Sequence, residues 1–142
     1  MQIRDIMTRD VQVVDPDASL RDAAELMEKL DIGLLPVCDG ERLVGMLTDR
    51  DMTVRATAKG LHPEKTCARD VMTPEAIWCY EDQDVEEAAA LMEQRQIRRL
   101  PILNRDKRLV GFLSLGDLAV RSQDRELAGE AIKRVSEPAE PN

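Results

Sequence analysis

Two short stretches of the chain, "GMLTDRD" and "GFLSLGD", carry a hydroxyl and a carboxylate at the same spacing after a glycine. Thr48 precedes Asp51 by three residues, and Ser114 precedes Asp117 by three residues. At a helix N-terminus, a hydroxyl beside the free N–H groups can help to hold a phosphate. A carboxylate one turn further can accept both hydroxyls of a ribose. The same spacing also makes a helix capping box, which occurs in proteins of every function.

The two stretches belong to an internal repeat that fills most of the chain. "IRDIMT" at 3–8 returns as "ARDVMT" at 68–73, and "RLVGMLTDRDMTVR" at 42–55 returns as "RLVGFLSLGDLAVR" at 108–121. The offset is 65 residues at the openings and 66 at the motifs. A fixed period of this kind indicates two copies of one structural unit.

We therefore divide the chain into a first repeat over 1–62, a second repeat over 63–121 that includes the linker, and a C-terminal helix with a frayed tail over 122–142. Within each repeat, hydrophobic periodicity predicts a β-α-β-β-α order. The predicted helices begin after the N-caps Ser19 and Asp84. The predicted strands cover 11–14, 34–38 and 43–48 in the first repeat, and 76–80, 100–103 and 109–114 in the second.

Packing sets the expected architecture. One unit of about 60 residues cannot bury both its sheet face and its helix face. We therefore expect an α/β (α+β) fold in which two units, related by a pseudo-twofold axis, pack sheet to sheet. The glycines that open the two motifs, Gly45 and Gly111, would let a ring or a backbone approach the strand closely.

Composition excludes several classes of function. The formal net charge is −8, the isoelectric point is near 4.7, and only 2% of the residues are aromatic. An acidic chain with few aromatic side chains is a poor nucleic-acid binder. The N-terminus lacks the apolar segment of a signal peptide, and no apolar run approaches the length of a membrane span. We expect a cytoplasmic protein that has no nucleic-acid or membrane partner and keeps its three cysteines reduced.

The reactive side chains do not form a catalytic or metal-binding pattern. His62 is the only histidine and lies in the linker, so no Ser-His-Asp or Cys-His arrangement can be assembled. The cysteines form no CxxC pair, and Cys38 and Cys79 lie at strand positions where small buried hydrophobes are expected. We predict no metal site and no enzymatic activity.

The ordered set of motifs resembles a tandem CBS-domain pair, or Bateman module. The set comprises the "IMT" and "VMT" openings, the "LLPV" and "RLPI" segments, and "LVGMLTDRD" and "LVGFLSLGD". The resemblance covers about 3–121. Within the family, the chain is similar to small stand-alone bacterial CBS-pair proteins, including hypoxic-response proteins, because a "KGLHP" linker follows "MLTDRD".

The resemblance implies a ligand, a site and partners. CBS pairs commonly bind adenine nucleotides such as AMP, ADP or ATP, or related adenosyl ligands, in clefts between the repeats. The resemblance implies no obligatory cofactor. It does imply a homodimer formed through exposed helices, and an effector protein on another chain. Carried over by position, the ligand-binding residues are Leu35, Pro36, Thr48, Asp51, Arg98, Arg99, Leu100, Pro101, Ser114 and Asp117.

The two halves of this site differ in charge. Arg98 and Arg99 match the place from which a basic residue of nucleotide-binding members reaches the phosphates, whereas the first repeat has Gly33 and Leu34 there. The arginines could equally be surface charges that pair with acidic neighbours. Two classes of function therefore remain open. One is a ligand-sensing regulatory module that signals to a partner, and the other is a ligand-free interaction or structural module.

Overall fold

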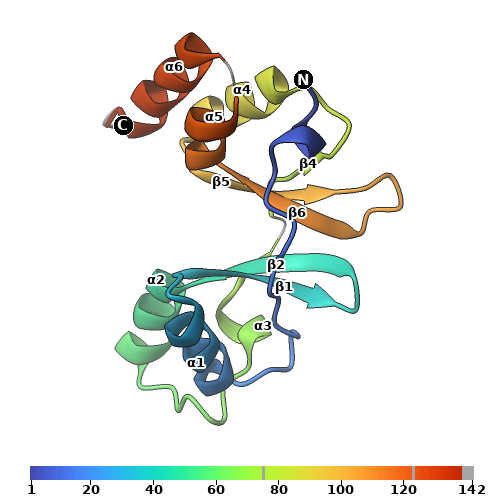
Figure 1. Ribbon diagram of the computed structural model, residues 1–142. Coiled ribbons are helices and arrows are strands. Elements are labelled where there is room, and N and C mark those ends of the chain that lie inside the picture. The colour runs from blue at the N-terminus through green and yellow to red at the C-terminus, as the bar shows by residue number, and fades with distance from the viewer. Residues whose placement is uncertain (75, 123, 139–142) are drawn as a thin grey trace. The chain divides into compact units, whose positions relative to one another are not determined.

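The computed structural model describes residues 1–74, 76–122 and 124–138, and it combines helices with two small sheets, which confirms the predicted α+β class (Figure 1). The chain forms two compact units. The first-repeat unit comprises Gln12–Ala76. The second-repeat unit comprises Met1–Val11 together with Ile77–Asn142.

The first-repeat unit contains a sheet of three strands in the order β1-β2-β3, in which all neighbours are antiparallel. Helices precede and follow the β1–β2 hairpin. The α2 helix continues without interruption into a π-helical turn and a 3-10 turn, which together make one longer helical segment. In chain order the elements are α1 (Leu20–Leu30), β1 (Leu34–Asp39), β2 (Arg42–Thr48), α2 (Asp49–Asp51), the π-helical turn (Met52–Ala56), the 3-10 turn (Thr57–Lys59), α3 (Ala68–Val71) and β3 (Thr73–Pro74).

The second-repeat unit contains a sheet in the order β4-β5-β6, with β4 parallel to β5 and β5 antiparallel to β6. Its N-terminal segment also contributes an isolated bridge between Thr8 and Phe112. In chain order the elements are a 3-10 turn (Ile3–Asp5), β4 (Cys79–Tyr80), α4 (Val85–Arg95), β5 (Arg99–Leu103), β6 (Leu109–Ser114), α5 (Leu115–Arg121) and α6 (Arg125–Ser136). The C-terminal helix predicted from the sequence is therefore present as α6, whereas 139–142 of the predicted tail lie outside the described residues.

The two predicted N-caps behave differently. The Ser19 hydroxyl accepts a hydrogen bond from the Asp22 N–H at 3.1 Å, as the capping pattern predicts. Asp84 occupies the N-cap of α4 but its side chain makes no capping bond. Backbone acceptors take its place, because the Val85 N–H donates to the Met1 carbonyl at 3.1 Å and the Glu87 N–H to the Asp84 carbonyl at 3.0 Å.

The first predicted strand of each repeat is shorter than the hydrophobic pattern indicates. In the first-repeat unit only Val14 pairs, as an isolated parallel bridge with Val37. The chain turns immediately afterwards, because the Asp15 side chain accepts from the Asp17 N–H at 2.8 Å. In the second-repeat unit the strand is reduced to Cys79–Tyr80, and position 75 is outside the described residues.

Each unit has its own aliphatic core. In the first-repeat unit, Leu20, Ala23 and Met27 of α1 pack with Leu35 and Leu47 of the hairpin. The second-repeat unit has the corresponding cluster, which also includes Ala128, Ala131 and Val135 of α6. Cys38 and Cys79 are buried as predicted, at 3% and 2% exposure. None of the helices within the described residues is long and apolar enough to cross a membrane.

The opening motif of one repeat packs against the last motif of the other. A Cβ atom at Gly45 would lie 2.7 Å from the Met72 sulfur and 2.8 Å from the Thr73 carbonyl oxygen. At Gly111 it would lie 2.9 Å from the Met7 sulfur and 2.7 Å from the Thr8 carbonyl oxygen. The close approach predicted at these glycines is therefore made by backbone and by a methionine, and no other residue type fits there without movement.

Candidate functional site

The hydroxyl and the carboxylate of each motif form a complete capping box. The Thr48 Oγ1 accepts from the Asp51 N–H at 3.0 Å, and the Thr48 N–H donates to Asp51 Oδ2 at 3.0 Å. Ser114 and Asp117 repeat this pair at 3.0 and 2.9 Å. Both aspartates are only 9% exposed. The capping interpretation therefore applies to both copies, and it leaves only the second carboxylate oxygen, Oδ1, for other contacts.

An arginine one turn further along each helix is a site residue that the sequence analysis missed. In the first-repeat unit, Arg55 Nη1 lies 3.8 Å from Asp51 Oδ1 and donates to the carbonyls of Val71 and Met72 at 3.0 and 3.1 Å. It also donates to the Thr73 hydroxyl at 3.3 Å. The guanidinium thus connects the Asp51 carboxylate to the last backbone carbonyls of the second repeat's opening segment, 68–73. A helix end leaves such carbonyls without a hydrogen-bond donor from the helix itself.

The second-repeat unit reproduces the same connection. Arg121 Nε lies 3.9 Å from Asp117 Oδ1, and Nη1 donates to the carbonyls of Ile6 and Met7, both at 3.4 Å. In addition, the Thr8 hydroxyl donates to Asp117 Oδ1 at 3.4 Å. The sequence does carry a signal for this contact, because "DMTVR" and "DLAVR" both place an arginine four residues after the aspartate.

The structure brings the two predicted basic residues to the start of α5. Arg99 is the direct partner of Ser114 in the β5–β6 ladder, and the Leu115 N–H donates to the Arg98 carbonyl at 3.0 Å. Both arginine side chains are exposed. The backbone of both arginines therefore lies beside Ser114 and the first turn of α5, whose N–H groups favour negative charge.

The equivalent place in the first-repeat unit has the opposite charge. Leu34 pairs with Thr48, and the Asp49 N–H donates to the Gly33 carbonyl at 2.9 Å, so the backbone arrangement is the same. However, a Cβ at Gly33 would lie 2.7 Å from Asp49 Oδ2. A carboxylate thus occupies the position beside the helix start, and Leu115 is its uncharged counterpart in the second repeat.

The remaining four predicted site residues are buried in the strands. Leu35 and Leu100 have no exposed surface and belong to the cores of their units. Pro36 and Pro101 are also buried and pair with Met46 and Phe112 in the hairpin ladders. These residues hold the strand ends that carry the polar side chains of the motif.

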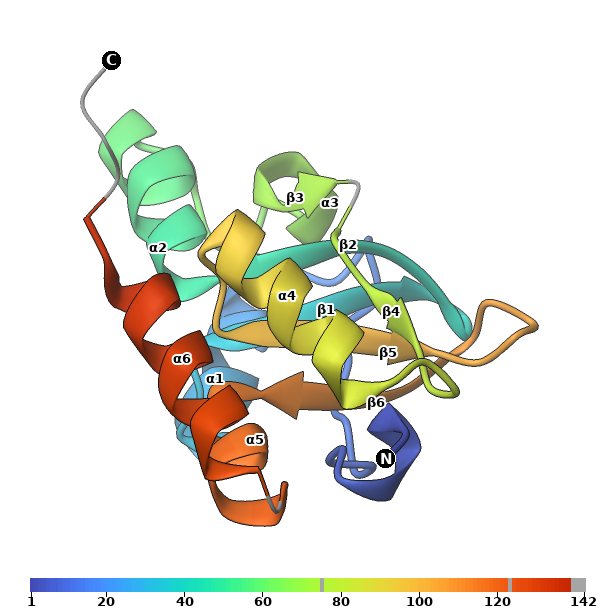
Figure 2. The same cartoon turned by 90° about the horizontal axis from the view of Figure 1, so that it is seen from above.

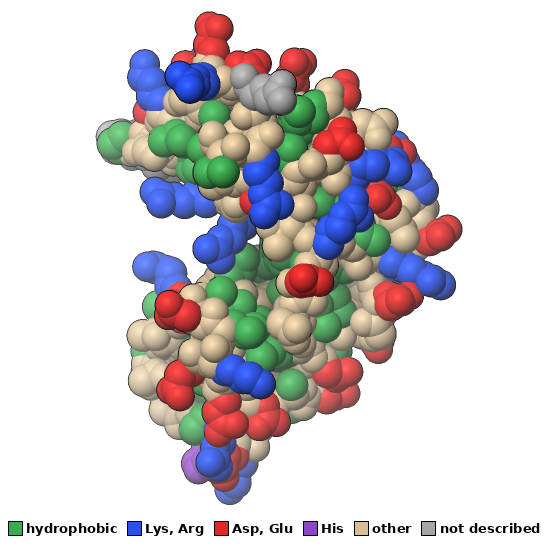
Figure 3. All heavy atoms as spheres, viewed as in Figure 1, with side chains coloured by type: hydrophobic (Ala, Val, Ile, Leu, Met, Phe, Trp, Pro, Cys, Tyr) green, Lys and Arg blue, Asp and Glu red, His purple; other side chains and the backbone are tan. Residues whose placement is uncertain are grey.

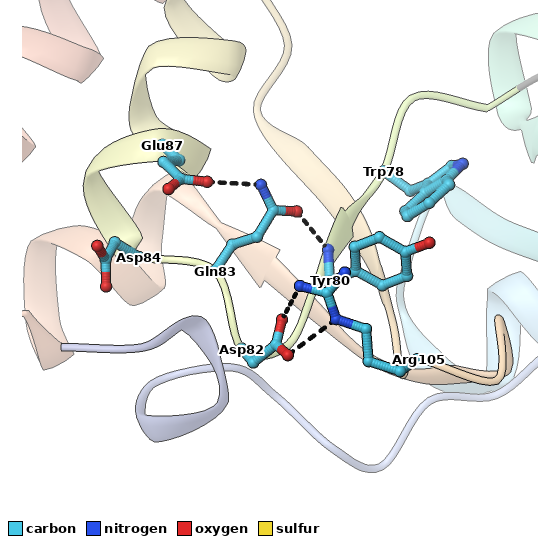
Figure 4. A pocket seen from close by; sticks show the side chains of 7 residues that line it. All are labelled: Trp78, Tyr80, Asp82, Gln83, Asp84, Glu87 and Arg105. Atoms are coloured by element: carbon cyan, nitrogen blue, oxygen red, sulfur yellow. Dashed lines mark hydrogen bonds and ion pairs between the residues drawn. The ribbon is translucent and has the colours of Figure 1, made fainter.

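A further pocket, of about 490 Å³, lies in the second-repeat unit and contains none of the predicted site residues (Figure 4). Trp78 and Tyr80 meet edge to face, with ring centroids 4.8 Å apart. Arg105 stacks on the Tyr80 ring at 4.0 Å and donates two hydrogen bonds to Asp82, at 2.8 and 2.9 Å. The Arg105 hydrogen bonds lower the pKa of Asp82 below its ordinary value. The remaining lining residues are Gln83, Asp84 and Glu87.

Surface charge and buried thiols add little further chemistry. Acidic and basic side chains are interspersed over the face shown in Figure 3. Burial raises the pKa of Cys38 to about 11, and burial with the nearby Glu87 raises the pKa of Cys79 to about 11, so both thiols stay protonated at neutral pH. Within the described ranges, no three His, Cys, Asp or Glu side chains are grouped closely enough to hold a metal ion.

Two repeated α+β units, each with a capped hydroxyl–carboxylate motif, define the class of protein. The sequence pattern of the CBS domain matches 3–55 and 68–123, and the chain belongs to the CBS-domain family as a tandem pair. It is 41% identical over 134 residues to the CBS domain-containing protein YhcV of Bacillus subtilis, covering 94% of each chain. It is 34% identical over 136 residues to Hypoxic response protein 1 of Mycobacterium tuberculosis, covering 95% of this chain and 94% of the relative.

Solved structures of CBS pairs share the fold. Hypoxic Response Protein I, solved with two coordinated zinc ions, has a TM-score of 0.78 at 36% identity, covering 87% of this chain and all of the other. CBSX2 from Arabidopsis thaliana in complex with AMP has a TM-score of 0.72 at 30% identity, covering 93% and 98%. The CBS pair of MJ0100 with 5-methylthioadenosine and S-adenosyl-L-methionine has a TM-score of 0.71 at 26% identity, covering 84% and 93%.

Proposed function

We propose that the chain is a regulatory module that binds an adenosine-type nucleotide and signals to an effector protein. The observation that carries the proposal is the placement of Arg98 and Arg99 at the start of α5, where their backbone pairs with Ser114 and Leu115. Complexes of related CBS pairs with AMP and with adenosyl ligands support the class of ligand. No catalytic chemistry is part of this role.

In this proposal the second-repeat unit binds the phosphates. Guanidinium groups and the first turn of α5 attract an anion there, whereas Asp49 repels one at the equivalent place in the first-repeat unit. The ribose is assigned to Asp117 Oδ1, the oxygen that the capping box does not use. A ribose diol that binds this oxygen would compete with Arg121 and with the Thr8 hydroxyl. Thr8 belongs to the opening segment of the first repeat, 3–8, and Arg121 contacts that segment.

That competition provides a route for signalling. Ligand binding at Asp117 would loosen the contact that ties Arg121 to the carbonyls of Ile6 and Met7. A ligand changes the conformation only if it binds the two arrangements with different affinity. The effector protein would then respond to the position of the opening segment.

Cytoplasmic placement accords with three cysteines that are all free thiols.

The oligomeric state belongs to the same proposal. We expect a homodimer through the second helix of each repeat, where Val54 is 48% exposed and Val120 is 83% exposed. Ala56 and Leu118, on the same helical segments, are buried within their own units and are not available to a partner. Sedimentation that finds only a 16.0 kDa species at micromolar concentration would refute the dimer.

A second candidate function follows from the capping boxes. Because both motif carboxylates already have a structural role, the chain could act as a ligand-free interaction module in which the motif only caps its helices. A thermal-shift panel of AMP, ADP, ATP, NAD and S-adenosylmethionine separates the two functions. A ligand at 100 times its Kd adds about 2.7 kcal/mol to the free energy of unfolding. Absence of any shift would favour the ligand-free module.

Calorimetry then tests which half binds. Because each charge-assisted phosphate bond contributes about 1.5–3 kcal/mol, Arg98→Ala/Arg99→Ala should weaken ATP at least about tenfold and change adenosine binding little. Lys29→Ala/Arg42→Ala, which removes two exposed cations of the first-repeat unit, is the matched control. If the arginine pair has no effect while Thr48→Ala abolishes binding in a folded protein, the first-repeat unit is the working site.

The ribose assignment has its own test. Asp117→Asn keeps a capping oxygen but removes the charge, and it should weaken adenosine and ATP to a similar degree. Asp51→Asn makes the same change in the other motif and should leave both affinities unchanged. Equal losses from the two variants would contradict the assignment to the second-repeat unit.

A further inference from the structure

The pocket of about 490 Å³ in the second-repeat unit, which we call the aromatic pocket, gathers the rarest side chains of the protein (Figure 4). The sequence has one tryptophan, one tyrosine and one phenylalanine. Trp78 and Tyr80 are the first two of these, and both line the pocket. The buried apolar clusters formed by the described residues include neither ring. Core packing therefore does not explain why the two rings lie together.

The first repeat forms the corresponding strand without aromatic rings. By the offset of 65 residues, Val13 corresponds to Trp78 and Asp15 to Tyr80. The hairpin turn that carries Arg105 is one residue longer than its counterpart in the first repeat. Both repeats nevertheless pair this strand in parallel with the first strand of the hairpin. Strand pairing therefore does not require the rings either.

One half of the aromatic pocket already holds a cation that the chain itself supplies. The Arg105 guanidinium lies 4.0 Å from the centre of the Tyr80 ring and donates to both carboxylate oxygens of Asp82, at 2.8 and 2.9 Å. A ring face beside a carboxylate is a combination that attracts a guanidinium or an ammonium group. Because the charges of Arg105 and Asp82 cancel, this half of the pocket is neutral.

The other half has the same two components without a cation. Trp78 meets Tyr80 edge to face, and among the described residues no basic side chain stacks on the indole ring. Asp84 makes no capping bond although it occupies the N-cap of α4. Within the described part of the chain, its carboxylate has neither a hydrogen-bond partner nor an ion-pair partner. Together with Glu87, it gives this half of the pocket two uncompensated negative charges.

Gln83 fixes the position of the second carboxylate. The Tyr80 N–H donates to Gln83 Oε1 at 2.7 Å, and Gln83 Nε2 donates to Glu87 Oε2 at 2.6 Å. Figure 2 shows how β4, at the edge of its sheet, leads through a turn into α4, so that these side chains come from one short stretch of chain. The bond from Gln83 leaves Glu87 Oε1 for another donor. A carboxylate held in this way is ready to pair without first being ordered.

We propose that the aromatic pocket binds an organic cation, namely a guanidinium or ammonium group carried on an aliphatic chain. The charged group pairs with Asp84 and Glu87, and Trp78 contacts the cation and its chain. An anion would be repelled by the two carboxylates, and a neutral ligand would leave them without a counter-charge. The cation is either a free small molecule or a basic side chain of a partner protein. The proposal does not rest on nucleotide binding, because the pocket contains none of the residues assigned to the nucleotide.

Trp78 provides a direct measurement, because it is the only tryptophan in the sequence. Titration of the full-length chain with butylguanidinium, without nucleotide, should change the tryptophan fluorescence in a saturable way. Butylurea has nearly the same shape but no charge, and it should cause no such change. An absent or unsaturable response to butylguanidinium overturns the proposal, and so does equal binding of butylurea.

Charge removal tests which carboxylates bind. Glu87→Gln and Asp84→Asn keep groups that can form hydrogen bonds, and each should weaken butylguanidinium at least about fivefold. Glu86→Gln removes an exposed charge from the same turn of α4 outside the pocket, and it should leave the affinity unchanged. Equal losses from Glu86→Gln and Glu87→Gln would show only a general attraction to an acidic surface, which overturns the site.

The ring and the source of the cation are tested by calorimetry. Trp78→Val introduces the residue that the first repeat has at the equivalent position, so this variant should fold, and it should weaken butylguanidinium about fivefold. Unchanged affinity in the folded variant overturns the role of the ring. The peptide acetyl-Gly-Arg-Gly-amide distinguishes the two sources. Binding as tight as that of butylguanidinium assigns the pocket to an arginine side chain of a partner protein, whereas binding of butylguanidinium alone assigns it to a free small molecule.

Discussion

Met72 lies directly against Gly45, so that a Cβ atom added to the glycine would be only 2.7 Å from the methionine sulfur. Gly45→Ala should therefore reduce the free energy of unfolding by about 1–3 kcal/mol, the usual range for overpacking a filled core. Urea denaturation measures the change. Gly129→Ala in α6, where no atom lies within 4 Å of the added Cβ, is the control and should be stabilising by about 0.5–1 kcal/mol. Equal effects of the two substitutions would contradict the close approach at Gly45.

Arg55 should anchor the opening segment of the second repeat to the first-repeat unit. Arg55→Met removes hydrogen bonds to two carbonyls while keeping an apolar stem, and it should cost about 1 kcal/mol because the side chain is partly exposed. Amide hydrogen exchange should become faster in 68–74. Arg50→Met, at an exposed position nearby, should change neither quantity, and faster exchange in both variants would show that the anchor is not specific.

The thiols should differ in reactivity. Cys67 is partly exposed, whereas Cys38 and Cys79 are buried and have pKa values of about 11. Near pH 8, a thiol reagent should modify one cysteine rapidly and the other two only after unfolding. Rapid reaction of all three in the folded protein would contradict the burial of Cys38 and Cys79. Peptide mapping identifies the modified residue.

The same two thiols predict a change of stability at high pH. The folded state holds their protons more tightly than the unfolded chain, in which the ordinary pKa is 9.0. Their contribution is fully present below pH 9.0 and is lost as the pH rises toward about 11. Cys38→Ala/Cys79→Ala should flatten that part of the pH profile in urea denaturation. An unchanged slope would assign the loss to other groups.

Fragments should fold according to the compact units and not according to the sequence repeats. A fragment of 12–76 keeps Met72 and Thr73 on Gly45, and also keeps the carbonyls that Arg55 binds. A fragment of 1–62 loses all of these contacts, and we expect it to aggregate or to lack a cooperative transition. Thermal unfolding followed by circular dichroism compares the two. A fragment of 1–62 that melts as cooperatively as 12–76 would show that the opening segment is dispensable.

The repeat, the class of fold and most element boundaries could be predicted because they rest on local patterns. The hairpin strands and α1 appear close to their predicted positions, since periodicity and capping at Ser19 are encoded in neighbouring residues. The packing of each repeat's opening motif against the last motif of the other repeat could not be predicted in this way. A methionine that packs on a glycine 27 positions away leaves no periodic signal. The role of Arg55 was hidden for the same reason, although its spacing from Asp51 was visible.

The residue types of the site could be predicted from the sequence, but the charged neighbour of the first-repeat motif could not. Thr48, Ser114 and their aspartates lie at helix starts as expected. The sequence did not reveal that Asp49 lies beside Gly33. This carboxylate makes the difference in charge between the two halves of the site larger than the arginines alone indicate. A side chain placed next to a residue 16 positions earlier depends on the hairpin register, which tertiary packing determines.

The division of the chain into units also sets an order for folding during synthesis. The first-repeat unit is continuous in sequence and is complete once β3 has left the ribosome. The second-repeat unit needs Met1–Val11, which emerges before the first-repeat unit, and α6, which emerges after it. Met1–Val11 must therefore remain without its partners until the second repeat has been synthesised. A protein tag or a binding partner that holds the nascent N-terminus would delay only the second-repeat unit.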